Sequence, residues 1–499
     1  MANKQNGQIQ YGSMAIPSKE SRLSILRWGW RGINRTDTVD TGSISDCSGV
    51  TVNDGRVSSV TDFGSLPVVQ GKVIGIYGVD DFILIIYRDT LVGNDLVLLQ
   101  VANPGKENSV YIKQTLNSNS DDMRTVVQFN TTVTGGNILT ATYVRKLLIY
   151  PDMVSVPMEY DEKTGIFLIG APEVFETEEN PQPNLKEATV FSGRLFGVDD
   201  NMVFASEFNN YSSWRLDTAD EISESNAWVS MTQSNSKADG IFTAICVYDN
   251  HVVLFKKDFT QLVYGDNNPF RIVDLVSYGA DNRNAVAEAQ GILYFVSKDN
   301  VYAFTGGIPK AIGDELHISD YSGACLGYFK DKLYMCVGKK LYMYRNGTWT
   351  ATDLKHHIVM FATCDFGLYG LMDAGHIEKI DSNEQEMGIG AYERDWWFET
   401  DLMCGGKLDI RRAKKISVLC DLAEGASVSV YLLKNGEEFD PETSEKVIEC
   451  NKVGKSVARG MLRGFSGFCH KLRICGKGKA TIHAAELLIS WGGDLYRNE

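Results

Sequence analysis

The stretch DKLYMCVGKKLYMYRNGTW, residues 331–349, holds two short apolar runs around a Gly-Lys-Lys turn and closes with a second turn, Asn-Gly. In the second run, Leu341 and Met343 alternate with Tyr342 and Tyr344. A period of two is typical of a β-strand, because successive side chains point to opposite faces of the sheet. The stretch therefore predicts an antiparallel β-hairpin.

The same succession of strand, tight turn and strand recurs along the chain. We place its turns at Asp80–Asp81, Arg145–Lys146, Gly193–Arg194, Asn250, Gly291, Lys332 and Gly367. The last four positions are 41, 41 and 35 residues apart, and each unit continues through another turn into a third strand. An antiparallel sheet repeated at this spacing is typical of a β-propeller blade, since a lone blade cannot bury both of its faces.

These units predict an all-β chain with a β-propeller of about six to eight blades. We place the propeller at residues 71–390 and a C-terminal β-sandwich-like domain at residues 391–499, where new strands replace the repeat. Residues 1–70 fit neither unit, and we expect them to form an N-terminal arm that wraps another surface or closes the ring. The alternative architecture is a pair of unrelated β-sandwiches.

Composition and charge narrow the function classes. The chain has 499 residues, 43% hydrophobic and 23% charged, and a formal net charge of −15. This acidity argues against a nucleic-acid clamp, which binds by neutralising phosphates with a basic surface. No stretch approaches the roughly 20 apolar residues of a membrane span, and the polar first twenty residues predict no secretory signal.

The ten cysteines form no Cys-x-x-Cys pair, and several lie in apolar strand-like runs. Their positions are 47, 246, 325, 336, 364, 404, 420, 450, 469 and 475. Without a secretory signal we expect buried, reduced thiols, with disulfides as the alternative. The glycosylation sequons at Asn130, Asn210 and Asn346 then carry no weight, because glycosylation requires secretion.

Two carboxylate pairs, Asp80–Asp81 and Asp199–Asp200, are the first candidates for catalysis. Each lies in a predicted turn, where aspartate is favoured for local hydrogen bonding, so we expect turn chemistry before general acid–base work. A glycosidase would need carboxyl groups that converge from different blades, which a sequence does not reveal.

The histidines and tryptophans give no clear site. The seven histidines are at 251, 317, 356, 357, 376, 470 and 483, and none has the spacing of a zinc site. The adjacent His356 and His357 would point to opposite faces of a strand. Four tryptophans could stack sugars or bases, although we expect them to fill an interface between domains: Trp28, Trp30, Trp396 and Trp397. No phosphate-binding loop or nucleophile elbow occurs, so we predict no catalytic residue, cofactor or metal, and no enzyme.

Several longer phrases resemble a family. RGINRTDTVDTGSISDCSGVTVNDGRVSS, residues 31–59, is similar to the opening of tail-nozzle and packaged-DNA-stabilisation proteins of short-tailed bacteriophages, although Cys47–Val50 stands where that opening has Asn-Val. FSGRLFGVDDNMVFASEFNNYSSW, residues 191–214, resembles a blade of the same family. Residues 252–316 resemble its next two blades, and LLISWGGD, residues 487–494, its closing strand.

The resemblance implies a structural virion protein of the phage tail, assembled in the bacterial cytoplasm. Several copies, commonly a hexamer, would form a ring on a head-to-tail adaptor, retain packaged DNA and let it exit during infection. If the conduit wall is acidic, it repels phosphate and DNA slides through it without binding. The alternative is a carbohydrate-binding or carbohydrate-cleaving β-propeller, either a receptor-binding tail part or a lectin-like protein.

Overall fold

The computed structural model describes most of the chain. The described residues are 14–15, 23–28, 30–35, 43–66, 71–79, 82–90, 95–102, 104, 110–116, 125–133, 142–150, 158–161, 166–169, 183, 185–211, 213–218, 222–231, 240–382, 394–402 and 411–491. They form β-strands, with two short 3-10 helices, η3 (Arg283–Ala285) and η4 (Asp314–Leu316). The prediction of an all-β fold is confirmed.

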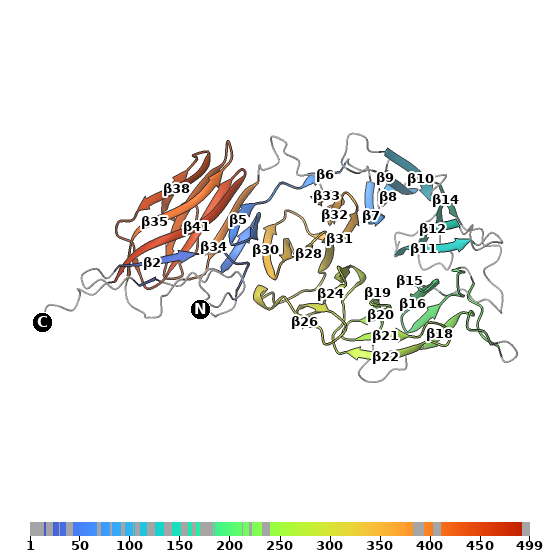
Figure 1. Ribbon diagram of the computed structural model, residues 1–499. Coiled ribbons are helices and arrows are strands. Elements are labelled where there is room, and N and C mark those ends of the chain that lie inside the picture. Colours follow the sequence, from blue (N-terminus) through green and yellow to red (C-terminus); the bar gives the residue numbers. More distant parts are fainter. Residues whose placement is uncertain are drawn as a thin grey trace.

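Seven four-stranded antiparallel sheets follow one another along the chain and form the blades of a propeller (Figure 1). Blade 1 is β7 (Gly71–Val79), β8 (Phe82–Asp89), β9 (Asp95–Ala102) and β10 (Val110–Leu116). Blade 2 is β11 (Thr125–Val133), β12 (Thr142–Tyr150), β13 (Met158–Asp161) and β14 (Ile166–Ile169). Blade 3 is β15 (Glu187–Phe191), β16 (Arg194–Val198), β17 (Met202–Ala205) and β18 (Trp228–Met231). Blades 4 and 5 are β19 (Phe242–Tyr248), β20 (His251–Lys256), β21 (Thr260–Tyr264), β22 (Arg271–Val276); and β23 (Val286–Ala289), β24 (Ile292–Val296), β25 (Val301–Phe304), β26 (Lys310–Ala311). Blade 6 is β27 (Cys325–Phe329), β28 (Lys332–Val337), β29 (Lys340–Arg345) and β30 (Thr348–Asp353).

Blade 7 takes its fourth strand from the N-terminal part of the chain. Its other strands are β31 (Ile358–Cys364), β32 (Gly367–Met372) and β33 (Ile377–Ser382). The short β6 (Gly64–Ser65) completes the sheet by pairing with β33 at Glu378 and Lys379. This strand from the start of the chain therefore closes the ring, and the blade count of seven lies within the predicted range.

Apolar residues on the inner strands hold the blades together. In β8 every residue is buried, as expected for a strand covered on both faces by neighbouring blades. The ring joint between blades 1 and 7 is a continuous apolar cluster that includes Leu66, Ile85 and Tyr369. At this joint β7 and β31 are so close that a Cβ atom on Gly78 would lie 1.7 Å from the Thr363 carbonyl oxygen.

The helix η3, in the connection from blade 4 to blade 5, contacts three other blades. From blade 5, Arg283 reaches Glu187 of blade 3, with Nη1 3.5 Å from Oε2, and lies 5.7 Å from the ring of Tyr77 in blade 1. Asn284 donates from Nδ2 to the Val359 carbonyl oxygen of blade 7 at 3.2 Å. One short turn thus ties together four of the seven blades.

The second unit is a two-sheet β-sandwich beside blade 6 (Figure 1). Its five-stranded sheet has the order β3 (Ile44–Ser48), β34 (Asp395–Thr400), β40 (His470–Lys477), β36 (Ser427–Lys434) and β37 (Lys446–Cys450). Its eight-stranded sheet is built from β1 (Met14–Ala15), β2 (Leu23–Trp28), β41 (Ala480–Trp491), β35 (Arg411–Leu422) and β38 (Gly454–Met461), with β4 (Val50–Asn53), β5 (Arg56–Ser59) and β39 (Ser466–Gly467) attached.

Residues 1–70, expected as an arm, are divided between the two units. Strands β1 to β5 belong to the sandwich and β6 belongs to blade 7. The last propeller strand ends at Ser382 and the first C-terminal sandwich strand begins at Asp395, while residue 390 lies outside the described residues. The sandwich is therefore assembled from both ends of the sequence.

One predicted turn is wrong. Arg145 and Lys146 lie in the middle of β12, where they pair with Asn130 and Phe129 of β11. The polar strand β11, TVVQFNTTV, was not recognised, so the run around β12 was divided into two strands instead. The turns placed at Lys332 and Gly367 lie slightly earlier in the structure, because both residues begin strands.

Candidate functional site

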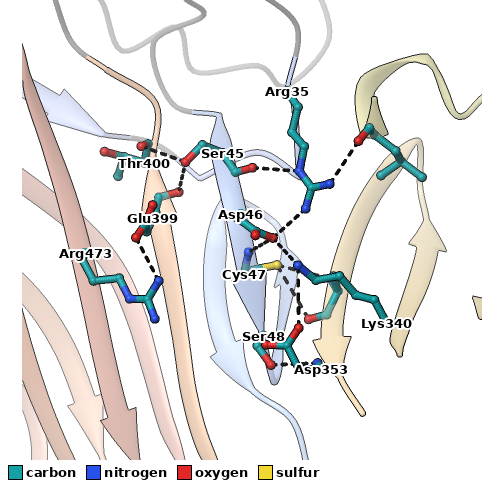
Figure 2. A network of polar contacts seen from close by, with 12 residues as sticks. Arg35, Ser45, Asp46, Cys47, Ser48, Lys340, Asp353, Glu399, Thr400 and Arg473 are labelled. Carbon is teal, nitrogen blue, oxygen red and sulfur yellow. Dashed lines mark hydrogen bonds and ion pairs between the residues drawn. The ribbon is translucent and has the colours of Figure 1, made fainter. Parts of the chain in front are cut away.

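The junction between propeller and sandwich is held by strand β3. Figure 2 shows this strand between the sandwich and blade 6. On one side β3 pairs with β34 of the sandwich. On the other, Ser48 Oγ accepts a hydrogen bond from the Asp353 backbone N–H at 2.8 Å, and Cys47 Sγ accepts one from the Ala351 N–H at 3.2 Å. These side chains satisfy the open edge of β30, the outer strand of blade 6, which would otherwise expose unpaired donors.

Asp46 is the charged centre of this junction (Figure 2). Arg35 donates from Nη2 to its carboxylate at 2.8 Å, and Lys340 of blade 6 donates from Nζ at 2.7 Å. Burial by itself would raise the pKa of Asp46, but the hydrogen bonds and charges of Lys340 and Arg35 outweigh it and lower that pKa. Arg35 also donates to the Leu316 carbonyl oxygen at 3.2 Å, so one residue from the N-terminal segment contacts both units.

A second charged group lies on the sandwich side. Glu399 accepts from Arg473 Nη1 at 2.9 Å and also pairs with Lys471. The Arg473 guanidinium lies 3.5 Å from the centroid of the Trp397 ring, and Lys340 Nζ of blade 6 lies 6.0 Å from the same centroid. These pairs hold the sandwich strands β34 and β40 together, whereas the contact of Asp46 with Lys340 links the sandwich to blade 6.

Beside this network lies a hollow of about 470 Å³. Blades 6 and 7 and the segment after β5 supply its walls. Asp381 accepts hydrogen bonds from Lys332 Nζ and from the Tyr334 hydroxyl, both at 2.6 Å. Burial and the neighbouring Asp381 raise the pKa of Tyr334, so the phenol stays protonated and remains a donor.

A neighbouring hollow of about 730 Å³ shares Asp62 and Phe63 with the first, and we call the two together the junction groove. Here Asp62 accepts from the Arg394 backbone N–H at 3.1 Å, and the Arg394 guanidinium lies 4.2 Å from the centroid of the Phe63 ring. Trp397 lines the far wall. The groove therefore combines fixed acceptors, fixed cations and aromatic rings.

Of the two carboxylate pairs in the sequence, the one that the structure describes, Asp199–Asp200, does not line the groove. Asp199 Oδ1 accepts from the backbone N–H groups of Asn201 and Met202 at 2.9 and 2.7 Å, and Asp200 pairs with Lys186. This is turn chemistry within blade 3. The pair Asp80–Asp81 lies outside the described residues.

The adjacent histidines point to different partners. His356 lies 3.3 Å from Asp373 and lines the junction groove, whereas His357 contacts the thiol of Cys336 through Nδ1 at 3.5 Å. Among the residues that the structure describes, no group of three or more histidine, cysteine, aspartate or glutamate side chains is arranged to hold a metal ion. Within the same residues, no helix has the length and apolarity to cross a bilayer.

The tryptophans divide between core and junction. Trp396 is buried in the sandwich and donates from Nε1 to the Gly478 carbonyl oxygen at 3.0 Å. Trp30 is buried with its ring 4.9 Å from that of Phe398. Trp397 alone of these three reaches the groove, while the Trp28 side chain lies outside the described part.

The phrase at residues 191–214 forms a buried structural cluster. Arg194 is fully buried and donates from Nη1 to the carbonyl oxygens of Ser206 and Asn226 at 2.7 and 2.8 Å. Trp214 packs in the same blade against Leu195. These residues stabilise the long connection between β17 and β18 and do not line the junction groove.

The cysteines differ from the expectation in one respect. Eight are free thiols: Cys47, Cys246, Cys325, Cys336, Cys364, Cys420, Cys450 and Cys475. Cys469 is disulfide-bonded, whereas the sequence was interpreted as having reduced thiols.

Sequence reasoning did not find the groove residues. Asp381 and Tyr334 are 47 positions apart, and Asp62 and Arg394 are separated by 332. No spacing motif links such residues, because Asp381 and Tyr334 lie on neighbouring blades and Asp62 and Arg394 lie on segments far apart in the sequence. The recurring apolar runs locate the blades but contain no signal for the groove.

Comparisons with known proteins concern the fold. No protein-family model matches the sequence, and a search of curated proteins finds no match. Among solved structures, the extracellular domain of a hybrid two-component system from B. thetaiotaomicron is 10% identical with a TM-score of 0.45, covering 87% of this chain and 60% of that one. A glycoside hydrolase family 43 arabinoxylan arabinofuranohydrolase from Bacillus subtilis is 9% identical with a TM-score of 0.24, covering 85% and 97%. An exo-β-1,3-galactanase from Phanerochaete chrysosporium is 8% identical with a TM-score of 0.28, covering 92% and 100%.

The chain spans 44% and 60% of the length of the first two structural neighbours, both extracellular domains from B. thetaiotaomicron. The neighbours correct one expectation. We predicted no enzyme, and glycoside hydrolases are among the solved structures that align with most of this chain, so that prediction is withdrawn. At these TM-scores the likeness is one of fold and assigns no activity to this chain.

Proposed function

We propose that this chain is a carbohydrate-binding β-propeller protein and that the junction groove holds the carbohydrate. The observation that supports this is the groove lining, in which the acceptors Asp381 and Asp62 and the donor Arg394 stand beside the rings of Phe63 and Trp397. A sugar presents hydroxyl groups that need fixed donors and acceptors, and apolar ring faces that pack on aromatic side chains. The groove volumes fall within the range of about 300–1,000 Å³ that is usual for small-molecule sites.

The phrases that resemble phage tail proteins favour one setting for this binding. In that setting the chain is a receptor-binding part of a bacteriophage tail, and the ligand is a polysaccharide of the bacterial surface. If the groove also cleaves this polysaccharide, two of its carboxyl groups would have to flank the scissile bond at about 5–5.5 or 6.5–9.5 Å.

The test is binding of purified full-length protein to cell-wall polysaccharide from candidate host bacteria, measured by calorimetry, with released sugar measured in parallel. We expect Asp381→Asn to weaken binding at least about tenfold, because hydrogen bonds to charged groups contribute about 1.5–3 kcal/mol. The control Asp258→Asn changes an exposed carboxylate between blades 4 and 5 and should leave affinity unchanged. Equal affinity of both variants, or no binding to any of the polysaccharides, would contradict the proposal.

A second candidate, a ring-forming conduit of the phage tail, is favoured by the distribution of charge. Residues 71–390, which hold nearly all of the propeller, contain 42 Asp and Glu against 25 Lys and Arg, whereas residues 391–499 contain 16 against 17. A ring of copies with propellers toward the lumen would repel DNA phosphates and let DNA pass. The mass of the purified protein, alone and with its head-to-tail adaptor, separates the two candidates: a closed homo-oligomer, commonly a hexamer, that binds no polysaccharide favours the conduit.

A further inference from the structure

Two cysteines face each other in blade 6. Cys325 of β27 and Cys336 of β28 are direct cross-strand partners. The strands are joined by the two-residue turn Lys330–Asp331, which makes Phe329 and Lys332 a hydrogen-bonded pair. Hydrogen-bonded and non-hydrogen-bonded pairs alternate along two antiparallel strands, so Cys325 and Cys336 also form a hydrogen-bonded pair, with Cα atoms about 5.5 Å apart. Disulfides need a Cα separation of about 4.4–6.8 Å, so the backbone already permits a bond between them.

The neighbouring blade binds both sulfur atoms. Cys325 Sγ lies 3.0 Å from the Ile358 carbonyl oxygen, and the Ile358 backbone N–H donates to Cys336 Sγ at 3.4 Å. His357 approaches Cys336 Sγ with Nδ1 at 3.5 Å, and the same nitrogen lies 2.6 Å from the Gly338 carbonyl oxygen. Both cysteines are buried, while His357 is half-buried.

These contacts favour a thiolate at Cys336. Hydrogen bonding from Cys325, with further contributions from His357 and the Ile358 N–H, lowers the pKa of Cys336 to about 6 against the effect of burial. The same contact with Cys336 raises the pKa of His357 to about 9, with Asp373 adding a smaller effect in that direction. A thiolate beside an imidazolium is the reactive form of a cysteine.

Among the described thiols, Cys47, Cys246 and Cys420 lack this arrangement. Burial raises the pKa of Cys47 and of Cys246 to about 12. Cys420 forms a close pair with Cys450, but burial raises the pKa of Cys420 to about 11 and no histidine contributes to it. The Cys420–Cys450 pair is therefore a control within the same molecule for proximity without activation.

We propose that Cys325 and Cys336 form an oxidation site that accepts a small hydroperoxide, with Cys336 as the attacking thiolate, Cys325 as the resolving thiol and His357 as the proton donor. The inference does not depend on carbohydrate binding. It assigns a covalent modification to blade 6 that no repeat or sequence motif indicates.

The reaction balances in two steps. The Cys336 thiolate attacks one peroxide oxygen, so that an S–O bond forms and the O–O bond breaks. The leaving hydroxide takes the proton of the His357 imidazolium and becomes water. Cys325 then passes its proton to the neutral imidazole and attacks the sulfenic acid sulfur. The S–S bond forms, the S–O bond breaks, and the leaving hydroxide takes the proton back from the imidazolium to form a second water. Two thiols are oxidised and one hydrogen peroxide is reduced to two waters.

The experiment is oxidation of the native full-length protein with hydrogen peroxide, unfolding in denaturant with N-ethylmaleimide to block the remaining thiols, and non-reducing peptide mapping by mass spectrometry. Trypsin cleaves after Lys310, Lys330, Lys332 and Lys339, so the two cysteines fall in separate peptides, residues 311–330 and 333–339. We expect a disulfide-linked pair of these peptides at peroxide doses that leave Cys47, Cys420 and Cys450 free to react with N-ethylmaleimide.

Two variants test the assigned roles. Cys325→Ala should trap Cys336 as a sulfenic acid that dimedone labels. His357→Gln should slow formation of the Cys325–Cys336 disulfide about tenfold, because a smaller fraction of Cys336 is then a thiolate. The thiolate that remains is intrinsically more nucleophilic, which offsets part of the loss in rate. The proposal fails if the two peptides are not linked before Cys420 and Cys450 are oxidised, or if His357→Gln oxidises at the wild-type rate. Both of these outcomes are measured on proteins that retain the Cys325–Cys336 pair, so they do not depend on the folding of an alanine variant.

Discussion

At the scale of single residues, close backbone approach decides which side chains the fold accepts. Gly78 lies where the inner strands of blades 1 and 7 meet, and a Cβ atom there would lie 1.7 Å from the Thr363 carbonyl oxygen. Backbone atoms cannot move aside as a flexible side chain would, so a larger residue has to separate the strands. Gly307, by contrast, has nothing within 4 Å of its Cβ position and no positive φ.

We therefore expect Gly78→Ala to lower the free energy of unfolding by about 3 kcal/mol or more, in the upper range for overpacking. Gly307→Ala is the matched control and should change it by less than about 0.5 kcal/mol. Denaturant unfolding followed by tryptophan fluorescence measures both. Equal stability of the two variants would show that the ring joint is not as closely packed as described.

Charge at Asp46 gives a second residue-scale expectation. The pKa of Asp46 is lower in the folded chain than in the unfolded chain. The ionised carboxylate therefore stabilises the folded protein fully above the unfolded pKa of about 3.9, and this stabilisation is lost as the pH falls through the lower folded pKa. The Asp46 side chain is 34% exposed, so we discount the effect for solvent screening and expect Asp46→Asn to cost about 1 kcal/mol at neutral pH.

The measurement is the difference in unfolding free energy between wild type and Asp46→Asn as a function of pH. This difference should be constant from neutral pH down to about pH 5 and shrink toward pH 3. Other carboxylates titrate in both proteins and cancel in the difference. A difference that stays constant down to pH 3 would remove Asp46 as the charged centre of the junction.

At the scale of elements, the ring depends on one very short strand. β6 contributes only Gly64 and Ser65 to blade 7, and the following Leu66 donates its backbone N–H to the Ile377 carbonyl oxygen at 3.2 Å. So few hydrogen bonds cannot hold a ring closed alone, and the burial of Leu66 to 5% exposure supplies the rest.

Leu66→Ala should therefore destabilise the protein by about 2–4 kcal/mol, as large-to-small core substitutions do. Hydrogen exchange should accelerate selectively in β31 to β33 and β7, since the joint opens there first. Ile308→Ala removes a side chain that is 87% exposed and should leave both quantities unchanged. Uniform acceleration across all blades would mean that the ring has no preferred joint.

The elements also show how far the sequence leads. Period-two alternation and regular spacing predict blades 4 to 6 well, because each is a compact meander of neighbouring strands. The sequence predicts a turn at Arg145–Lys146 because two adjacent charged residues resemble a turn. Their partner strand β11 holds many polar residues and gives no strand pattern that would correct this prediction. β6 and the groove residues Asp62 and Asp381 could not be predicted, since two residues carry no periodicity and long-range contacts leave no local pattern.

At the scale of the whole molecule, propeller and sandwich form one connected body. The Arg35–Asp46–Lys340 contacts link the N-terminal segment to blade 6, and Glu399 with Arg473 holds the adjacent sandwich strands (Figure 2). Removing one partner of such a network leaves a charge without compensation, which costs more than the pair itself contributes. The orientation of the groove walls is therefore set by both units, and a ligand in the groove would contact both.

The strand exchange between the two ends of the sequence bears on how the protein is made. Strands β1 to β6 are synthesised before the blades, and among them only β1 with β2 and β4 with β5 can pair at once. Strands β2 and β5 also pair with β41, β3 pairs with β34, and β6 pairs with β33, and these partners are synthesised after the other blades. During translation these strands therefore lack their final partners while the middle blades are synthesised and fold. Nascent chains halted before residue 377 would therefore contain a propeller that is not yet closed, and a chaperone that shields exposed strand edges would bind at strands β2, β3, β5 and β6.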